Sequence, residues 1–426
     1  MKISSVKGFR DVLPDEAARR RRIAGESVRV LESYGYAEIE VPILERVELF
    51  SRSVGQTSDI VEKEMYAFED RDETVVALRP EGTASVVRAY VEAGLPRAMP
   101  VARLFYTGPM FRRERPQKGR FRQFAQIGAE LLGRDDPEAD AETLCLVADI
   151  CLAVGVDGAR IDINSLGDVA CRPVYREALI AFGRERFEEL CEECRARLER
   201  NPLRLLDCKN ERCREVTRDA PVMLDHLCEA CRTHHERVLR LLDAADVAVT
   251  PNPRMVRGLD YYCRTAFEIV ATGLGAQDAI GGGGRYDGLV AALGGPDVPG
   301  IGFAFGLERL DLASGSRDAM AAPADFCVVP IGEHAAACAL ALARRLRAGR
   351  HTVELASSAR KLKAQLQRAE KAGIRYVIII GDDELALGRA TLRDMTERTE
   401  IQGCFSLEAP VADIVTSIER TTRREA

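Results

Sequence analysis

Hydrophobic and polar positions along the chain predict a large first domain of strands and helices. Residues 16–34 repeat apolar positions at a helical period, with Asp15 expected as the N-terminal cap and Gly35 as the stop. Further helices are predicted at 82–92 and 306–312, and strands at 36–41, 65–68, 74–78, 101–111, 122–132, 160–164, 265–270 and 300–305. Because several of these strands are joined by hairpins rather than by helices, we expect an α+β domain with an antiparallel sheet and flanking helices.

Two segments depart from this pattern. Residues 168–245 are mostly helical, charged and cysteine-bearing, which predicts an inserted subdomain. The small, polar segment 314–324 is the expected linker. Beyond it, strands at 325–331, 352–355 and 376–380 alternate with helices at 333–348 and 360–372, an order typical of a small parallel-sheet α/β domain. The predicted domains are therefore 1–324 and 325–426.

Composition and length are typical of a multidomain globular protein. A chain of 426 residues is longer than one hydrophobic core usually organises, so more than one domain is expected. The content of 46% hydrophobic and 30% charged residues is typical of a folded chain rather than a disordered one. No apolar run reaches the roughly 18 residues that span a bilayer. The first residues lack the apolar stretch of a secretory signal. We therefore expect a cytoplasmic protein with no membrane partner.

Charge is distributed unevenly along the chain. The formal net charge is −6, but residues 325–426 hold 16 Lys/Arg and 14 Asp/Glu, and the segment 112–122 has six basic residues with only Glu114 as an acid. This segment lies between two predicted strands, which would hold the arginines at its base rigidly. The planar arginine group can pair with two phosphate oxygens at once, in ATP or in an RNA backbone. A solvated charged loop is the alternative interpretation.

Other segments combine residue types that suit a charged ligand. Residues 256–262 place Arg257 near an acid and two tyrosines, which could form an aromatic and charged pocket or an ordinary surface loop. The glycines of 281–288 could make an anion-binding turn, or only a tight turn before a helix. The predicted helix 306–312 carries Arg309. This arginine could emerge near the end of the sheet that the strand 300–305 belongs to, or it could lie on the helix surface. At a predicted helix N-terminus, Glu81 could bind an ammonium group or merely cap the helix.

These segments, in this order, resemble the class II aminoacyl-tRNA synthetases, and specifically the histidyl-tRNA synthetases. Three segments are similar to the motifs 1, 2 and 3 that class II enzymes share: 35–42, 111–130 and 300–309. Two more segments point to histidine in particular: 257–262 and 283–288. The segment 78–83 is similar to the family's amino-acid-binding turn. The resemblance extends from about residue 8 to about residue 405.

The resemblance implies a two-step reaction. Histidine would be activated by ATP to histidyl-adenylate and pyrophosphate, and then transferred to the 3′-terminal adenosine of tRNA(His). Both ATP and the carboxylate of histidine are anions, so fixed arginines and Mg²⁺ would supply much of the acceleration. The C-terminal domain resembles the anticodon-binding domain of this group. Because motif 1 builds the dimer interface in class II enzymes, a homodimer is implied.

The resemblance also assigns residues to the amino acid. The α-ammonium group would be held by Glu81 and Thr83 with help from Gln126. The imidazole nitrogens would be reached by Glu130 and Tyr262. The implied histidine-binding set is Glu81, Gly82, Thr83, Arg112, Gln126, Glu130, Arg257, Tyr261 and Tyr262.

The catalytic and nucleic-acid contacts are implied in the same way. As catalytic residues, Arg112 would bind the α-phosphate and orient the carboxylate, and Arg257 would stabilise the charge that develops there. Arg309 would hold the γ-phosphate. The implied ATP-binding set is Arg112, Arg120, Arg257 and Arg309, and the implied contacts to the tRNA acceptor end are Arg115, Gln117, Lys118 and Arg120.

Thirteen cysteines in a chain without a secretory signal argue against a disulfide framework. Two Cys-x2-Cys pairs, Cys191 with Cys194 and Cys228 with Cys231, are separated by 33 residues that include Cys208 and Cys213. Paired motifs of this kind are typical of tetrahedral zinc, but the gap is longer than usual and zinc is not part of the family's chemistry. Free thiols are therefore favoured over a structural zinc site, which stays open.

Two other functions compete with the ligase. Some relatives share this catalytic fold but are regulatory subunits of a histidine-biosynthesis enzyme, and they usually lack the anticodon domain and the motif arginines. The chain keeps Arg112, Arg257 and Arg309 and a C-terminal domain, which disfavours that function. Ligation of a different amino acid is disfavoured by the two histidine-type segments.

Overall fold

The computed structural model describes residues 3–53, 55, 60–117, 119–256, 259, 261–272, 274, 278–315 and 323–423. The chain divides into two compact units, Met1–Met320 and Ala321–Ala426. Each unit has its own hydrophobic core, and each is described by itself. None of the described helices is both long and apolar enough to cross a membrane.

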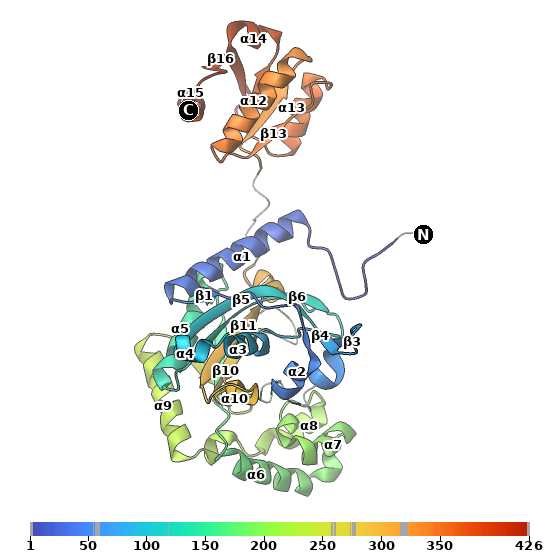
Figure 1. The fold of residues 1–426 in the computed structure, drawn as a ribbon, viewed down its shortest axis with the longest axis vertical. Helices are drawn as coiled ribbons and strands as arrows, with labels where there is room; N and C mark the ends of the chain where they lie inside the picture. The colour runs from blue at the N-terminus through green and yellow to red at the C-terminus, as the bar shows by residue number, and fades with distance from the viewer. Residues whose placement is uncertain are drawn as a thin grey trace. The chain divides into compact units, whose positions relative to one another are not determined.

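An eight-stranded sheet forms the centre of the first unit (Figure 1). Its strands are β1 (Ala37–Glu38), β5 (Ala102–Phe111), β6 (Gln123–Leu132), β7 (Arg160–Ser165), β8 (Val249–Pro251), β9 (Cys263–Val270), β10 (Ala279–Arg285) and β11 (Gly300–Gly306). Their order across the sheet is β1-β5-β6-β11-β10-β9-β7-β8. Neighbours from β5 to β7 run antiparallel, and only the edge strands β1 and β8 run parallel to their neighbours. The predicted antiparallel α+β domain is confirmed.

Each face of this sheet packs against its own hydrophobic core, because successive side chains along a strand point to opposite faces. Phe105 points into the core shared with α1 (Pro14–Ser33), α5 (Pro137–Val154) and α9 (Glu229–Ala244), whereas its neighbours Leu104 and Tyr106 point into the core shared with α3 (Thr83–Glu92) and α10 (Leu289–Ala292). This is the expected result of a two-residue side-chain repeat. The helix α1 begins at Pro14 with Leu13 at the cap position, so the predicted Asp15 cap was wrong. Proline suits the first helical turn because the amide it lacks would have no partner there.

A small second sheet lies beside the α3 face. It contains β2 (Leu44–Arg46), β4 (Val75–Leu78) and β3 (Tyr66–Glu69), and the predicted hairpin between the last two is confirmed. Short helices complete this region: α2 (Val47–Ser53), a π-helical turn (Ile60–Glu64) and α4 (Leu95–Ala98). The helix α11 (Leu307–Ala313) directly follows β11.

The predicted insertion is helical. Its helices are α6 (Arg172–Glu185), α7 (Glu192–Arg200), α8 (Glu211–Val216) and α9, joined by short 3₁₀ turns (green and yellow-green in Figure 1). A buried ionic network fixes α9 to the sheet: the Asp140 carboxylate of α5 accepts hydrogen bonds from Arg285 of β10 at 3.0 Å, and its other oxygen lies 2.8 Å from His234 Nε2 of α9. Because Arg285 is fully buried and used in this way, it holds the fold together rather than facing a ligand.

The glycine run at 281–284 corrects another expectation. It lies within β10, between β9 and β11, and forms no anion-binding turn. The expected tight turn before a helix is found only at the end of the segment, where Gly288 directly precedes α10. A methyl group at Gly283 would lie 2.1 Å from the carbonyl oxygen of Gly302, and one at Gly302 would lie 1.8 Å from Glu130 Oε2. Glycine is therefore required here because the strands and the Glu130 side chain leave no space for a Cβ atom.

The second unit has a five-stranded sheet with the order β13-β12-β14-β15-β16. Its elements are β12 (Phe326–Pro330), α12 (His334–Ala348), β13 (Val353–Leu355), α13 (Leu362–Lys371), β14 (Tyr376–Ile380), α14 (Asp382–Leu387), β15 (Arg389–Asp394), β16 (Thr399–Ser406) and α15 (Val411–Arg423). The first three strands in that order are parallel, as predicted, but β15 and β16 form an antiparallel extension. The expectation of an all-parallel sheet was therefore wrong at this edge.

Two glycine substitutions should have opposite effects on stability. Gly302→Ala should lower the melting temperature because its methyl group would overlap Glu130 and the β6 backbone. Gly25→Ala should increase stability by about 0.5–1 kcal/mol, because Gly25 lies within α1 with open space around it. Thermal unfolding of the two variants and the wild type measures both effects. Equal melting temperatures for Gly302→Ala and the wild type would contradict the packing described here.

Candidate functional site

A cavity of about 210 Å³ opens on the α3 face of the large sheet. Its walls come from the start of α3, the strands β6, β9, β10 and β11, the segment between β5 and β6, and α11. The charged and aromatic side chains that line it are Glu81, Tyr106, Arg112, Glu114, Arg120, Phe124, Tyr261, Tyr262, Glu268, Phe303, Glu308 and Arg309. The other lining residues are Thr83, Gly119, Gln126, Leu259, Ala279, Ile280, Gly281, Gly282, Ala304 and Gly306.

Glu81 forms one end of the cavity and also caps α3. Its carboxylate accepts hydrogen bonds from the backbone N–H groups of Thr83 at 2.7 Å and Ala84 at 2.9 Å. Burial raises the pKa of Glu81, while these N–H groups and the charge of Arg112 act to lower it. The capping interpretation is thus correct, but the same side chain faces the cavity, where an ammonium group would compensate its burial.

The turn that carries Glu81 is fixed by two arginines. Arg79 is buried and donates to backbone carbonyl groups of Pro109, at 2.9 Å, and Val41, at 2.6 Å. Arg112 Nε donates to the carbonyl oxygen of Pro80 at 2.8 Å. Arg79 therefore has a structural role, whereas Arg112 supports the turn and lines the cavity.

Glu130 lies behind the cavity wall and is not among the residues that line it. Its side chain is fully buried and accepts hydrogen bonds from Thr83 Oγ1, at 2.7 Å, and from the Tyr286 hydroxyl group. Burial raises the pKa of Glu130 to about 8, against the lowering effects of these two hydroxyl groups. Burial therefore favours the protonated form of the Glu130 carboxyl group over the charged form.

Aromatic rings and an amide close the same end of the cavity. The ring centroid of Tyr261 lies 4.7 Å from that of Tyr262 and 5.7 Å from that of Tyr286. Gln126 Oε1 is buried and has no hydrogen-bond partner among the described residues. Because an unpaired buried acceptor is costly, Gln126 is suited to accept a hydrogen bond from a ligand.

Guanidinium groups also line the cavity. Arg112 lies over the Phe124 ring, with its guanidinium carbon 5.2 Å from the ring centroid. Arg120 Nη1 lies 3.4 Å from Glu114 Oε2. Burial lowers the pKa of Arg309, and the nearby positive charge of Arg120 lowers it further. Guanidinium groups that approach one another in a partly buried site favour a bound anion, which would offset their repulsion.

The structure brings most of the predicted site residues together. Those that line the cavity are Glu81, Thr83, Arg112, Gln126, Tyr261, Tyr262, Arg120 and Arg309. Gly82 precedes α3, where a Cβ atom would lie 2.2 Å from the Tyr106 ring. Arg115 and Gln117 are exposed on the segment between β5 and β6. Arg257 and Lys118 lie outside the described residues.

Several lining residues were missed from the sequence, including Tyr106, Glu114, Phe124, Glu268 and Glu308. Tyr106 could have been found, because alternation in β5 places it opposite Gly128 on the face that carries Gln126. Glu308 had no signal in the sequence. Its carboxylate accepts a hydrogen bond from the N–H group of Ala125 at 3.0 Å and lies 2.9 Å from Arg20, which depends on the tertiary fold.

Comparison with known proteins decides the family. The family model of histidyl-tRNA synthetase matches residues 8–310, and that of an anticodon binding domain matches residues 325–419. The chain belongs to the histidyl-tRNA synthetase family. The family and the fold class predicted from the sequence are thereby confirmed.

Individual members of the family are similar along almost the whole chain. A histidine–tRNA ligase of Geobacter metallireducens is 52% identical over 398 residues, covering 93% of this chain and 96% of the relative. One from Geobacter sulfurreducens is 49% identical over 412 residues, covering 97% and 100%. The crystal structure of the apo histidyl-tRNA synthetase of S. aureus has a TM-score of 0.80 and 34% identity, covering 97% of this chain and 99% of that one.

The raised pKa of Glu130 predicts a pH effect on stability. The unfolded chain releases this proton near the ordinary pKa of 4.5, whereas the folded chain keeps it up to about 8. The free energy of unfolding should therefore fall as the pH rises between about 5 and 8, at roughly 1.4 kcal/mol for each unit of pKa difference.

Glu130→Gln cannot ionise, so its melting temperature should fall less over this range. Glu62→Gln, at an exposed position, is the control. Parallel pH profiles for Glu130→Gln and the wild type would refute the buried protonated carboxyl group.

Proposed function

We propose that the chain is an ATP-dependent histidine–tRNA ligase. The observation that supports this most directly is the convergence of Arg112, Arg120 and Arg309 on one cavity that Glu81 and paired tyrosines also line. Adenylate formation joins a carboxylate to an α-phosphate, so two anions must be held close together. Fixed guanidinium groups in a partly buried cavity lower that electrostatic barrier.

The amino acid would occupy the end near α3. Glu81 would bind the α-ammonium group, with Thr83 and Gln126 as further hydrogen-bonding partners. A protonated Glu130 behind Thr83 would set the hydrogen bonding of the pocket wall, and Tyr262 would contact the imidazole ring. A side chain without ring nitrogens would leave buried polar groups unpaired, which costs more than a poor apolar fit.

ATP would occupy the cationic end. Arg112 would bind the α-phosphate and orient the histidine carboxylate, because it lies between the Glu81 turn and Phe124. Arg309, with Arg120 beside it, would hold the γ-phosphate. We keep Arg257 as the second catalytic arginine, on the resemblance of 257–262 to the family segment. Release of pyrophosphate would then leave the acyl-adenylate bound by Arg112 and Arg257.

We also propose that Mg²⁺ enters with ATP. Glu114 and Glu268 line the same cavity as Arg309, and Mg²⁺ is commonly bound by one or two carboxylates together with phosphate oxygens. The ion would neutralise charge on the outer phosphates.

The tRNA would contact two regions of the chain. The exposed Arg115 and Gln117, with Lys118 and Arg120, would meet the acceptor end beside the cavity. Residues 325–426, which carry a slight excess of basic residues, would bind the anticodon. We further propose a homodimer, because 35–42 resembles class II motif 1, and a cytoplasmic location, where translation takes place.

Removing the Arg309 charge should weaken ATP binding most. Arg309→Ala should raise the KM for ATP by about tenfold or more in histidine-dependent pyrophosphate exchange, with a smaller change in the KM for histidine. Arg71→Ala, at an exposed turn outside the lining, is the matched control. A KM for ATP equal to that of the wild type, in a variant with an unchanged melting temperature, would remove Arg309 from the nucleotide site.

Deleting residues 325–426 should separate the two steps. The hydrophobic cores of the first unit use no residue beyond Ala313, so the remaining chain should still form the adenylate. Charging of tRNA(His) should fall by about tenfold or more because the anticodon contacts are lost. The measurement compares pyrophosphate exchange with aminoacylation on one preparation. Undiminished charging would show that these residues do not bind the tRNA.

A further inference from the structure

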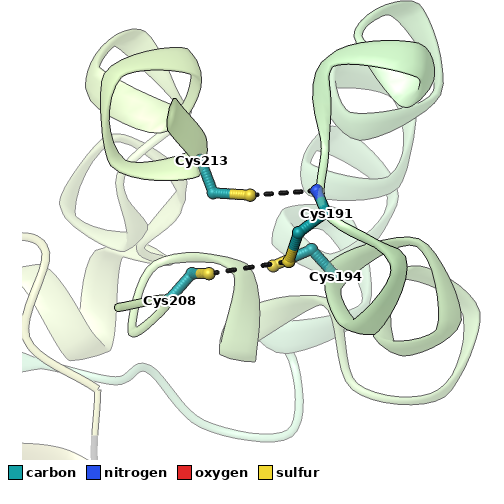
Figure 2. Close-up of side chains that lie close together, drawn as sticks. All are labelled: Cys191, Cys194, Cys208 and Cys213. Carbon is teal, nitrogen blue, oxygen red and sulfur yellow. Dashed lines mark hydrogen bonds between the residues drawn. The ribbon is translucent and has the colours of Figure 1, made fainter. Parts of the chain in front are cut away.

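The insertion contains two compact groups of metal-ligand side chains that the ligase reaction does not use. The first is Cys191, Cys194, Cys208 and Cys213, and the second is Asp168, Cys171, Cys228 and Cys231. Within each group, the four ligand atoms all lie within 4.8 Å of one another. Figure 2 shows the four thiol groups of the first group pointing toward a common centre, from the start of α7 and from the chain at and before α8.

The spacing of the sulfur atoms fits one tetrahedral ion. Zinc–thiolate bonds of about 2.3 Å place neighbouring sulfurs roughly 3.8 Å apart in a tetrahedron. Cys191 Sγ and Cys208 Sγ are 3.9 Å apart, far beyond a disulfide bond, and every cysteine of the two groups is a free thiol. An iron–sulfur cluster holds several irons between its cysteines and needs a wider arrangement.

Both groups have the same local architecture. Cys191 and Cys228 are the N-cap residues of α7 and α9, and each Cys-x2-Cys pair is completed within the first helical turn. The N–H group of Cys191 donates to Cys213 Sγ at 3.1 Å, and that of Cys228 donates to Cys171 Sγ at 3.1 Å. An N–H donor and a helix N-terminus both stabilise a thiolate, the form that binds a metal.

The clusters also explain how so small an insertion stays folded. Three of the six buried residues in the core around the first group are its own cysteines. Thiols fill little volume, so this core alone buries little apolar surface. A metal ion that joins four chain positions replaces the missing core, as in other small domains.

We propose that the insertion binds two zinc ions, one held by the four cysteines of the first group and one by the three cysteines and the aspartate of the second. Zinc suits both because it prefers tetrahedral sulfur ligands and accepts a carboxylate oxygen. The first site joins α7 to α8, and the second joins the start of α6 to the start of α9. Metal would thus hold the insertion at two places.

The second site is also connected to the catalytic cavity. Arg172, next to Cys171, donates to the carbonyl group of Tyr262, and the N–H group of Leu166 donates to the carbonyl group of Arg264 at 2.7 Å. Loss of the second ion should therefore loosen the wall that carries Tyr262. Loss of the first should destabilise the insertion with less effect on that wall.

Metal analysis of the full-length protein, purified without chelator under reducing conditions, tests the proposal. We expect two zinc ions per chain in the wild type. The double variant Cys191→Ser/Cys208→Ser should retain one ion, and Cys171→Ser/Cys228→Ser should retain one. Cys145→Ser and Cys338→Ser, which change cysteines outside both groups, should retain two.

Cobalt titration of the wild-type chain gives a second readout that needs no variant. After removal of zinc, the reduced wild-type chain should take up two equivalents of Co²⁺ with strong thiolate-to-cobalt absorption, and zinc should displace them. In pyrophosphate exchange, Cys171→Ser/Cys228→Ser, which removes the second site, should show a raised KM for histidine. Cys191→Ser/Cys208→Ser, which removes the first site, should show a smaller change. A wild-type chain that contains no zinc and takes up no cobalt would overturn the proposal, as would iron with sulfide or disulfides in place of the free thiols.

Discussion

The buried Glu130 carboxyl group joins the segments that enclose the cavity. It lies on β6, receives hydrogen bonds from Thr83 at the start of α3 and from Tyr286 after β10, and occupies the space that Gly302 of β11 leaves open. Burial makes a charged carboxylate costly in this position and raises the pKa of Glu130, whereas the hydrogen bonds from the two hydroxyl groups act in the opposite direction. This part of the cavity wall therefore depends on strand packing, because the strands can approach closely only where glycine faces Glu130.

The arginines that line the cavity show the opposite arrangement. There, guanidinium groups from separate segments meet in a partly buried space, and the pKa of Arg309 falls through burial and the charge of Arg120. The fold holds these cations in place through backbone and carboxylate contacts, such as Arg112 with Pro80 and Arg120 with Glu114. Substrate phosphates would complete the charge balance. One cavity is thus lined both by hydrogen-bonding groups, such as Thr83 and Gln126, and by the guanidinium groups of Arg112, Arg120 and Arg309.

Sequence patterns predicted those parts of the fold that depend on local periodicity. The hairpin of β5 and β6 and the hairpin of β3 and β4 follow from alternation, and the order of the motifs indicated the family. The role of the glycines in β10 was not predicted, because they avoid contacts across strands, which no local pattern reveals.

The grouping of the cysteines in the insertion was not predicted for a similar reason. The sequence placed the two Cys-x2-Cys pairs together, but Cys228 and Cys231 lie with Asp168 and Cys171. The candidate binding residue Glu81 could be proposed from the sequence because its motif is contiguous, whereas the position of Glu308 depends on tertiary contacts with Ala125 and Arg20.

The central claim is that this cavity activates histidine with ATP. Its most direct test is pyrophosphate exchange into ATP by the full-length chain, measured with each of the common amino acids in turn. The account predicts strong exchange with histidine alone, because only its ring offers two nitrogens to the polar wall of Tyr262 and the Glu130 network. Exchange driven equally well by another amino acid, or absent with histidine, would contradict it.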